Sequence, residues 1–318
     1  MNQSILLTGA SGFIGRTLAG TLCKLASVKV LGRKNPQLIN THFVAGDVCT
    51  IRHHESTFDN VSVVIHCAAR VHIMNDKSSD SLCDFRNVNT LGTLNLAKQS
   101  VANGVKRFIF ISSIKVNGES TLSDIPFTGA DARSPEDFYG QSKSEAEEQL
   151  LELAKETGLE VVIIRPTLVY GPGVKANFAS LLKLVSKGLP LPFGCIKDNK
   201  RSLVSVKNLV DLIITCIDHP KAANQVFLVS DDHDVSTASM VKHMSHALGK
   251  SSRLLPVPLW CYRLVGKLSG KTDVVDRLLG SLQVDISHTK DTLGWVPPQT
   301  LEQGFKETAE SFLLNKNK

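Results

Sequence analysis

The sequence of 318 residues lacks any hydrophobic run long enough to cross a bilayer. A spanning helix needs about 20 consecutive apolar residues, whereas the longest candidate, residues 209–217, is short and is interrupted by Asp211. The chain begins Met1-Asn2-Gln3, without a basic head, and the apolar run that follows has no cleavage site of the signal-peptide kind. We therefore expect a cytoplasmic protein without a transmembrane segment.

The sequence also lacks the patterns of a metal, disulfide or nucleic-acid-binding protein. Its seven cysteines are odd in number and scattered, with no C-x-x-C pair, which excludes a disulfide framework and a zinc site. The formal net charge is only +6, and the basic residues are spread without interleaved aromatics. Acidic residues are absent from residues 1–46 and 235–272. This balance suits a small acidic substrate, with no metal and no nucleic acid.

In the first half of the chain, short β-branched runs alternate with longer helical patterns, which is typical of βαβ units. Buried strands are predicted at residues 4–8, 28–31, 43–45, 61–67, 107–112 and 161–165. Helices are predicted at residues 13–26, 82–103 and 139–157, where apolar residues recur every three or four positions. We expect an α/β protein with a doubly wound, Rossmann-like parallel sheet.

A Gly/Pro-rich stretch, Tyr170-Gly-Pro-Gly173, marks a change of pattern. Residues 202–206 and 225–229 look like strands that return to the sheet, and from about residue 235 the chain is mostly helical. We expect residues 1–170 to bind a dinucleotide, with residues 200–230 returning to that domain. Residues 171–199 and 231–318 are expected to form a smaller, mostly helical substrate lobe.

A glycine-rich loop, Gly9-Ala-Ser-Gly-Phe-Ile-Gly15, follows the first predicted strand and opens the first helix. Glycines let the backbone turn tightly and approach a pyrophosphate, while the helix N-terminus offers free N–H groups. The loop therefore predicts a dinucleotide site that includes Gly9, Ser11, Gly12, Phe13, Ile14 and Gly15.

The second predicted strand ends in Leu31-Gly-Arg33-Lys34, where an NAD-selective site usually carries an acidic residue. An arginine there can pair with a 2′-phosphate, so Arg33 favours NADP(H). Solvated loop charges with NAD(H) as cofactor are the alternative. Asp47 and Val48, after the third strand, are candidates to contact the adenine.

Tyr139-Gly-Gln-Ser-Lys143 opens a predicted helix, and Ser112-Ser113 ends the strand before it. A spacing of four places Tyr139 and Lys143 on one helical face, where the ammonium can lower the pKa of the phenol. A serine hydroxyl can polarise the same oxygen. These three side chains predict proton exchange with a carbinol oxygen while a nicotinamide exchanges hydride with its carbon.

With these motifs the sequence resembles the extended short-chain dehydrogenases/reductases that act on nucleotide-sugars. The resemblance covers nearly the whole chain. It rests on Thr8-Gly-Ala-Ser-Gly-Phe-Ile-Gly15, His66-Cys-Ala-Ala69, Asn89-Thr-Leu-Gly-Thr93, Ile111-Ser-Ser113, Tyr139-x-x-x-Lys143, Arg165-Pro-Thr-Leu-Val-Tyr-Gly-Pro172 and Leu293-Gly-Trp295.

The resemblance implies a catalytic role for Tyr139 as acid/base, for Lys143 as its pKa modulator and ribose anchor, and for Ser113 as the hydroxyl partner. It implies further that cofactor is contacted by Ala68, Ala69, Asn89 and Pro166. A UDP-linked sugar would be held by Ser113, Lys115, Asn177 and Arg201, with Arg277 as a weaker candidate. It also implies a homodimer formed through residues 82–103 and 139–157.

Ile114 and Lys115 stand where the dehydratases of this family carry an Asp-Glu pair, which makes dehydration improbable. Two activities then remain. A 4-ketoreductase must exchange its cofactor, which fits Arg33, and Lys115 and Asn117 depart from the common epimerase pattern. The chain here resembles the bacterial polysaccharide-pathway group that includes the UDP-N-acetylquinovosamine dehydrogenases. We therefore expect an NADP(H)-preferring reduction of a UDP-4-keto-6-deoxy-N-acetylhexosamine in lipopolysaccharide or O-antigen synthesis. The alternative is a UDP-hexose or UDP-N-acetylhexosamine 4-epimerase with tightly bound NAD.

Two further segments are interpreted from their charge. Residues 145–148, Glu-Ala-Glu-Glu, are expected to be the solvated face of the Tyr139 helix. In residues 235–272, Lys and Arg alternate with Leu and Trp260, a pattern of either a substrate-lobe helix or a basic amphipathic segment on an anionic membrane. The second interpretation would suit a membrane-associated epimerase of a polyprenyl-diphosphate-linked sugar, and we favour the first.

Overall fold

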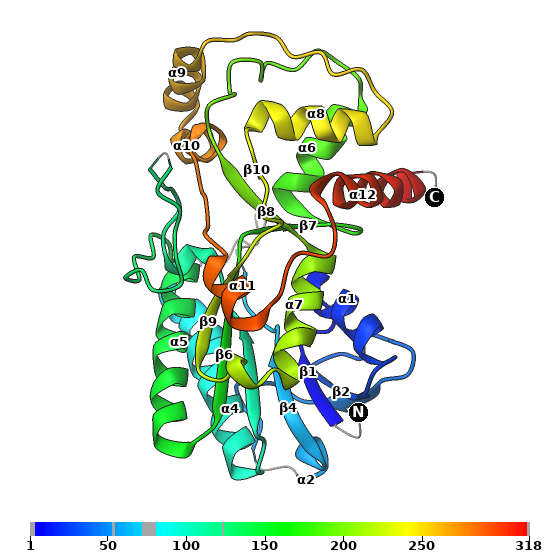
Figure 1. The fold of residues 1–318 in the computed structure, drawn as a ribbon, viewed down its shortest axis with the longest axis vertical. Helices are drawn as coiled ribbons and strands as arrows, with labels where there is room; N and C mark the ends of the chain where they lie inside the picture. Colours follow the sequence, from blue (N-terminus) through cyan, green and yellow to red (C-terminus); the bar gives the residue numbers. More distant parts are fainter. Residues whose placement is uncertain (1–3, 53–54, 72–80, 123, 317–318) are drawn as a thin grey trace.

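Seven parallel strands form the centre of the molecule (Figure 1), in the order β3-β2-β1-β4-β5-β6-β9. The computed structural model describes residues 4–52, 55–71, 81–122 and 124–316. Apolar runs such as Ile5–Leu7 are buried on both faces, as parallel strands between helices must be. The strands are β1 (Ser4–Thr8), β2 (Ser27–Gly32), β3 (His42–Ala45), β4 (Val61–His66), β5 (Arg107–Ile111), β6 (Glu160–Pro166) and β9 (Gln225–Val229).

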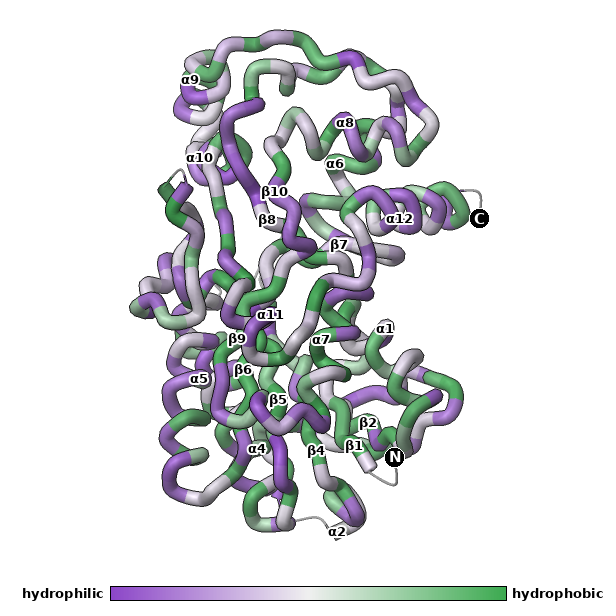
Figure 2. The backbone as a smooth tube through the Cα atoms, in the orientation of Figure 1, coloured by the Kyte–Doolittle hydropathy of each residue, from purple (hydrophilic) through white to green (hydrophobic). Residues whose placement is uncertain are grey.

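Helices cover both faces of this sheet, and each face has its own apolar core. On one face α1 (Phe13–Leu22) and α7 (Val206–Asp218) bury their apolar sides against the strands. On the other face α4 (Thr93–Ala102) and α5 (Phe138–Thr157) do the same. Figure 2 shows the hydrophobic residues gathered along β4 and β5, between these layers. The shorter elements are α2 (Glu55–Phe58), α3 (Leu82–Phe85), a π-helical segment (Arg86–Gly92), 3₁₀ turns (Ile114–Val116 and Pro220–Ala222) and α11 (Ser287–Leu293).

A second body is built around a small sheet of order β10-β8-β7 and a third apolar core. Tyr170 and Phe178 stack with ring centroids 5.4 Å apart, and Phe305 packs against both. This body is mostly helical, and the expected fold class is confirmed. Its elements are β7 (Leu168–Tyr170), α6 (Ala176–Ser186), β8 (Arg201–Ser205), β10 (Asp234–Val235), α8 (Thr237–Ala247), α9 (Leu259–Ser269), α10 (Thr272–Leu279) and α12 (Leu301–Lys316).

A buried polar network joins the two bodies. The Tyr170 hydroxyl donates to Asp231 Oδ2 at 2.7 Å, and Asp231 Oδ1 accepts from the backbone of Ser205 and from Asn208 Nδ2. Asn208 Nδ2 also donates to the carbonyl of Gln299. Burial raises the pKa of Asp231, while these hydrogen bonds oppose the rise. The network therefore ties α7, β7 and the approach to α12 together at one point.

Two predicted elements differ from the structure. The helix expected at residues 82–103 is divided into α3, the π-helical segment and α4. Apolar spacing does not distinguish these forms, because a π turn only widens an otherwise continuous helix. Of the two strands expected to return to the large sheet, β9 pairs with β6, but β8 pairs with β7 and β10 in the small sheet. A short buried strand carries no sign of which sheet it joins.

Candidate active site

The glycine loop lies at the carboxyl end of β1, where the strand order reverses between β1 and β4. Gly9 has φ +74°, and a Cβ there would lie 2.5 Å from the backbone nitrogen of Ala68. A Cβ on Gly15 would lie 2.2 Å from the carbonyl oxygen of Gly9. Only glycine fits at these two positions, so the loop and the Ala68 segment approach each other closely.

The N-terminus of α1 is open to an anion. Gly12 is the N-cap residue and has no side chain to cap the helix, and the first turn contains no acidic residue. Ser11 and Gly12 are exposed, whereas Phe13 and Ile14 are half-buried and pack against the core. Backbone N–H groups at such a helix start favour a pyrophosphate, so these residues fit a dinucleotide.

On the neighbouring strand, Arg33 directly follows β2, and its side chain is 83% exposed. Its Nε lies 4.0 Å from Asp47 Oδ2, and Asp47 Oδ1 accepts a hydrogen bond from the backbone of Cys49. Val48, which lies between Asp47 and Cys49 in the chain, is buried. The predicted adenosine-side residues are therefore neighbours, but the cation of Arg33 already faces a carboxylate.

The three predicted catalytic residues lie on two elements that pack against each other, helix α5 and the turn after β5. Asp137 caps α5 by accepting from the backbone of Gly140 at 2.6 Å. A Cβ on Gly140 would lie 2.7 Å from the carbonyl oxygen of Lys115, so the first turn of α5 presses against the turn that follows Ser113. Ser113 itself caps that turn by accepting from the backbone of Lys115, which leaves its own proton to be donated.

Lys143 is buried one turn after Tyr139. Its Nζ donates to the carbonyl of Ile111 at 2.8 Å and lies 4.3 Å from the centroid of the Phe110 ring. Burial lowers the pKa of Lys143 to about 8, while the charges of Cys67 and Glu147 act in the opposite direction. Tyr139 packs edge-on against Phe85.

The expected lowering of the Tyr139 pKa by Lys143 is not found in this arrangement. Burial raises the pKa of the phenol, and the nearby carboxylate of Asp137 raises it further. Lys143 makes its hydrogen bond to Ile111 instead, so its charge does not outweigh the loss of hydration. His66, on β4, lies between the hydroxyls of Thr8 and Thr93, and burial with the Lys143 charge lowers its pKa to about 3. It is neutral.

Glu147 corrects the expectation for residues 145–148. Rather than lying on a solvated face, it is fully buried, and one of its oxygens is 2.5 Å from Arg165 Nη2. Its other oxygen accepts from the Ser112 hydroxyl at 2.6 Å, and Arg165 Nη1 donates to Asn117 Oδ1 at 2.9 Å. Arg133 Nε approaches the same carboxylate at 3.5 Å. Glu147 thus links the end of β5, through Ser112, to β6, through Arg165. Its spacing of four from Lys143 places it on the same face of α5, and this spacing could have indicated its burial from the sequence.

Three of the predicted substrate residues lie in one chain of contacts. Lys115 Nζ pairs with Glu119 at 2.6 Å and with Asp137 at 2.5 Å. The other oxygen of Glu119 lies 3.8 Å from Arg277 Nε, and Arg201 Nη1 donates to the carbonyl of Arg277 at 2.7 Å. Burial and the Arg277 charge lower the pKa of Arg201. The Arg201 guanidinium thus bonds the backbone of Arg277, while the Arg277 guanidinium faces the carboxylate of Glu119.

The remaining predicted residues are placed differently. Asn177 is exposed in the first turn of α6 and makes none of these contacts. Asn89 is buried and bonds both backbone groups of Arg70 and the Ser142 hydroxyl, so it joins the Ala69 segment to α5. Pro166 is buried at the end of β6.

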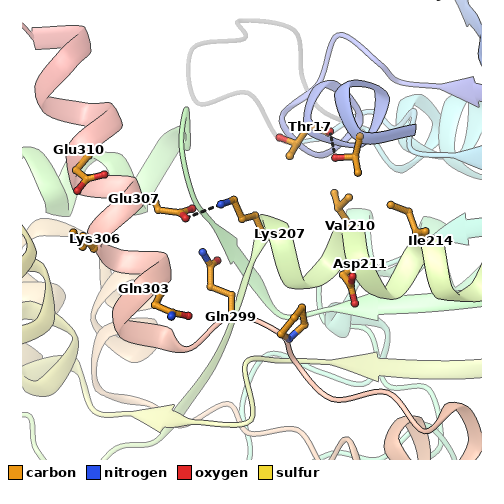
Figure 3. A pocket seen from close by; sticks show the side chains of 12 residues that line it. Thr17, Lys207, Val210, Asp211, Ile214, Gln299, Gln303, Lys306, Glu307 and Glu310 are labelled. Atoms are coloured by element: carbon orange, nitrogen blue, oxygen red, sulfur yellow. Dashed lines mark hydrogen bonds and ion pairs between the residues drawn. The ribbon is translucent and has the colours of Figure 1, made fainter. Parts of the chain in front are cut away.

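The hollow in Figure 3, of about 710 Å³, lies away from these residues, between α1, α7 and α12. Its walls include Thr17, Val210 and the ion pair of Lys207 with Glu307. No predicted site residue lines it. Within the described ranges, no three His, Cys, Asp or Glu side chains gather as a metal site, and no helix has the length and apolar character to span a membrane.

The sequence matches the family model described as the NAD dependent epimerase/dehydratase family over residues 5–230. The chain belongs to this family. It is 62% identical over 322 residues to a Vibrio cholerae protein named UDP-glucose 4-epimerase, covering 100% of this chain and 98% of that one. It is also 30% identical to an Escherichia coli O157:H7 protein named N-acetyl-alpha-D-glucosaminyl-diphospho-ditrans,octacis-undecaprenol 4-epimerase, with 98% and 95% covered.

Solved structures share the fold. A Thermotoga maritima UDP-glucose 4-epimerase with UDP-glucose matches with a TM-score of 0.79 and 23% identity, covering 99% of this chain and 100% of that one. A Bacillus cereus UDP-glucuronic acid 4-epimerase in complex with NAD matches with a TM-score of 0.77 and 19% identity, covering 98% and 99%.

These findings correct two expectations. The 4-ketoreductase activity is contradicted, because the relative that is 62% identical over the full chain is named an epimerase. The preference for NADP(H) is not supported, because the family is described by NAD. The cofactor expectation rested on Arg33, and the activity expectation rested on Arg33 together with Lys115, Asn117 and the likeness to UDP-N-acetylquinovosamine dehydrogenases. In the structure the Arg33 side chain is exposed and its Nε lies 4.0 Å from Asp47. Membership of the extended short-chain dehydrogenase/reductase family is confirmed, whereas the particular likeness to UDP-N-acetylquinovosamine dehydrogenases is not.

Proposed function

We propose that this protein interconverts the C4 epimers of a UDP-hexose, UDP-glucose and UDP-galactose, with a retained NAD. The observation that carries the proposal is the 62% identity over the whole chain to the Vibrio cholerae protein named UDP-glucose 4-epimerase. The buried Lys143, the Ser113 turn and the first turn of α5 form a site that suits such a reaction. Residues 1–170 with 200–230 would hold NAD, and residues 171–199 with 231–318 would hold the sugar nucleotide.

NAD would be held by the Gly9–Gly15 loop, the start of α1 and the Asp47 segment, and when bound it supplies the acceptor and then the donor of the C4 hydride. Tyr139 takes the proton of the C4 hydroxyl and later returns a proton to the same oxygen. Ser113 donates a hydrogen bond to that oxygen, which stabilises the charge that develops there. A positive charge on Lys143, four residues along the same helix, would favour the phenolate of Tyr139 and so oppose burial and Asp137, which both raise the pKa of the phenol.

Epimerisation requires the oxidised hexose to turn over while its nucleotide remains bound. Arg201 and Arg277, on β8 and α10, would hold the diphosphate. The sugar then rotates about its bond to the anchored phosphate and presents its other face to the same hydride. A diphosphate anchor on the substrate lobe, away from Tyr139 and Ser113, is compatible with such a rotation.

The test is to purify the protein, release its nucleotide by acid and identify it, and then to follow UDP-galactose conversion with no cofactor added. We expect NAD to be released and UDP-glucose to form, and the Tyr139→Phe variant to retain NAD and lose at least 10³-fold in kcat. The matched control is Tyr262→Phe, outside the proposed site. An empty protein that consumes added reduced cofactor mole for mole, without interconverting UDP-hexoses, would refute the proposal.

A further inference from the structure

Helix α9 turns apolar side chains toward solvent. Trp260, Leu264 and Leu268 are 65%, 48% and 78% exposed. Because they are spaced four residues apart, they form one line along the helix, here called the α9 stripe. The opposite side of the helix is already occupied, since Gly266 is buried and a Cβ there would lie 2.7 Å from Val275 on α10. The apolar stripe therefore faces outward, which reverses the usual orientation of a surface helix.

Positive charge accompanies the stripe. Arg263 and Lys267 are exposed on the same helix, each one residue before a leucine of the stripe, and Lys271 follows the helix end. Residues 235–272 contain no Asp or Glu. Val265 and Val274 add further exposed apolar surface on α9 and α10. On α9 the apolar line is thus accompanied by cations and by no acidic residue, whereas the neighbouring helix α10 carries the exposed Asp273 and Asp276.

We propose that the α9 stripe docks this protein on the surface of an anionic lipid bilayer. Leucine side chains enter the boundary between headgroups and acyl chains, and tryptophan is favoured at that depth because its ring is apolar with one polar N–H. Arg263 and Lys267 then lie at the level of the lipid phosphates, each adding to binding. The helix lies in the interface and does not span it, in keeping with its length of 11 residues.

A second copy of the chain fits this surface poorly. In a symmetric dimer the same patch faces itself, so Arg263 and Lys267 would meet their own counterparts. Helix α9 itself carries no acidic residue to compensate, and Asp273 and Asp276 lie on α10. A bilayer also needs no matching groove, and α9 lies at one end of the long axis of the molecule (Figure 1), where a flat surface can reach it. Charge and position therefore favour a lipid surface over a protein partner.

Docking through α9 would place the substrate lobe next to the lipid headgroups. Arg277 lies on α10, which packs directly against α9, so the proposed diphosphate site borders the docking surface. The docking proposal does not depend on the proposed reaction, because none of the stripe residues belongs to the proposed catalytic or substrate contacts.

The test uses the full-length protein and sedimentation with vesicles of phosphatidylglycerol and phosphatidylethanolamine, compared with vesicles of phosphatidylcholine alone. We expect sedimentation with the anionic vesicles, weakened by high salt. Fluorescence gives a second readout, because the only other tryptophan, Trp295, is buried and donates to Asp211. A blue shift of the emission on binding would report Trp260.

Paired variants separate the stripe from general effects. L264S/L268S should lower the partition coefficient at least tenfold, whereas L313S/L314S on the exposed side of α12 should leave it unchanged. R263E/K267E should lower it tenfold or more, whereas K24E/K155E, with the same change in net charge at exposed sites elsewhere, should lower it less than twofold. All four variants should retain the turnover of UDP-galactose.

Three results would overturn the proposal. The first is no sedimentation with the anionic vesicles. The second is equal binding by L264S/L268S and its control. The third is a dimer in light scattering that dissociates on Leu264→Ser and Leu268→Ser substitution, since the stripe would then be an interface between copies. If the wild-type protein does not turn over UDP-galactose, the proposed reaction is refuted, but the vesicle result is unaffected. The two failures are therefore distinguishable.

Discussion

Replacing Glu147 by glutamine should move the alkaline limit of activity to lower pH. Lys143 must remain protonated to favour the Tyr139 phenolate, and burial sets its pKa at about 8. The carboxylate of Glu147 raises that pKa and balances the charge of Arg165. Glu147→Gln removes the negative charge and leaves Arg165 and the more exposed Arg133 beside Lys143. An unbalanced positive neighbour disfavours the ammonium, so the pKa of Lys143 must fall.

The size of the shift follows from distance. Residues four apart on a helix have Cβ atoms about 5–6 Å apart, and both side chains extend beyond Cβ, so the carboxylate charge that is lost with Glu147 lies on the order of 8 Å from the Lys143 ammonium. At an effective dielectric constant of about 20, two unit charges at 8 Å interact by about 2 kcal/mol. That energy corresponds to about 1.5 pKa units. The alkaline limb of kcat should therefore move from near pH 8 to between about pH 6 and 7.

Stability should change as well, because the substitution leaves a buried guanidinium without its partner. Removing one member of a buried ion pair costs about 3–5 kcal/mol. A double variant, Glu147→Gln with Arg165→Met, removes both charges and should recover much of this loss. It should also return the alkaline limb toward that of wild type, since neither charge then acts on Lys143. Glu148→Gln, at the exposed neighbouring position, is the control for both measurements.

The assay is UDP-galactose turnover between pH 5.5 and 10, with NAD retention and thermal unfolding measured on the same samples. If Glu147→Gln folds, retains NAD and keeps the wild-type alkaline limb, Glu147 does not act on Lys143 and the electrostatic reasoning is wrong. If the double variant shifts as far as the single one, the effect belongs to altered packing and not to the charge of Arg165.

Two further predictions concern binding. Gly15→Ala should abolish NAD retention, because its Cβ would lie 2.2 Å from a backbone oxygen, whereas Gly20→Ala on the same helix has open space and should retain NAD; equal retention by the two variants would contradict the tight-turn argument. Arg277→Ala should raise KM for UDP-galactose about tenfold with little change in kcat, as expected for the loss of one charged hydrogen bond. Arg263→Ala on neighbouring α9 should leave KM unchanged, and a KM for Arg277→Ala equal to wild type would exclude it from the diphosphate site.

Most strands of the large sheet could be predicted from the sequence because they are short apolar runs between helices and are buried on both faces, although β3 at the edge contains no buried residue. Residues 225–229 were predicted with their observed bounds as β9. The sheet that residues 202–206 join could not be predicted, since β8 is nearly as buried as the central strands and its pairing depends on the path of β7 after Pro166. The local hydrophobic pattern indicates that a segment is a strand, whereas the path of the chain determines which strand it pairs with.

The parts of the candidate site that could be predicted are those whose residues lie at fixed spacings within one short segment. Tyr139 and Lys143 share a helical face, and Gly9 and Gly15 meet close neighbours, as their positions implied. Burial was harder to predict. From the sequence alone Glu147 resembles an exposed acidic residue, because its partner Arg165 lies on another element and pairs with it only in the folded structure. The effect of Arg33 was misjudged for a similar reason, because Asp47 approaches it only across the β2–β3 pair.

The seam formed by Tyr170, Asp231 and Asn208 has a consequence for how sugar nucleotide enters. Opening the two bodies like a hinge at this point would break several buried hydrogen bonds at once, each with a penalty of about 1–3 kcal/mol if left unpaired. We therefore expect local opening to occur first in α9 and α10, before the two bodies separate. Helix α10 has no buried residue, and the only buried residue of α9 is Gly266. If the protein turns over a sugar nucleotide as proposed, we expect product release to follow the movement of this helical pair and not a rotation of whole lobes.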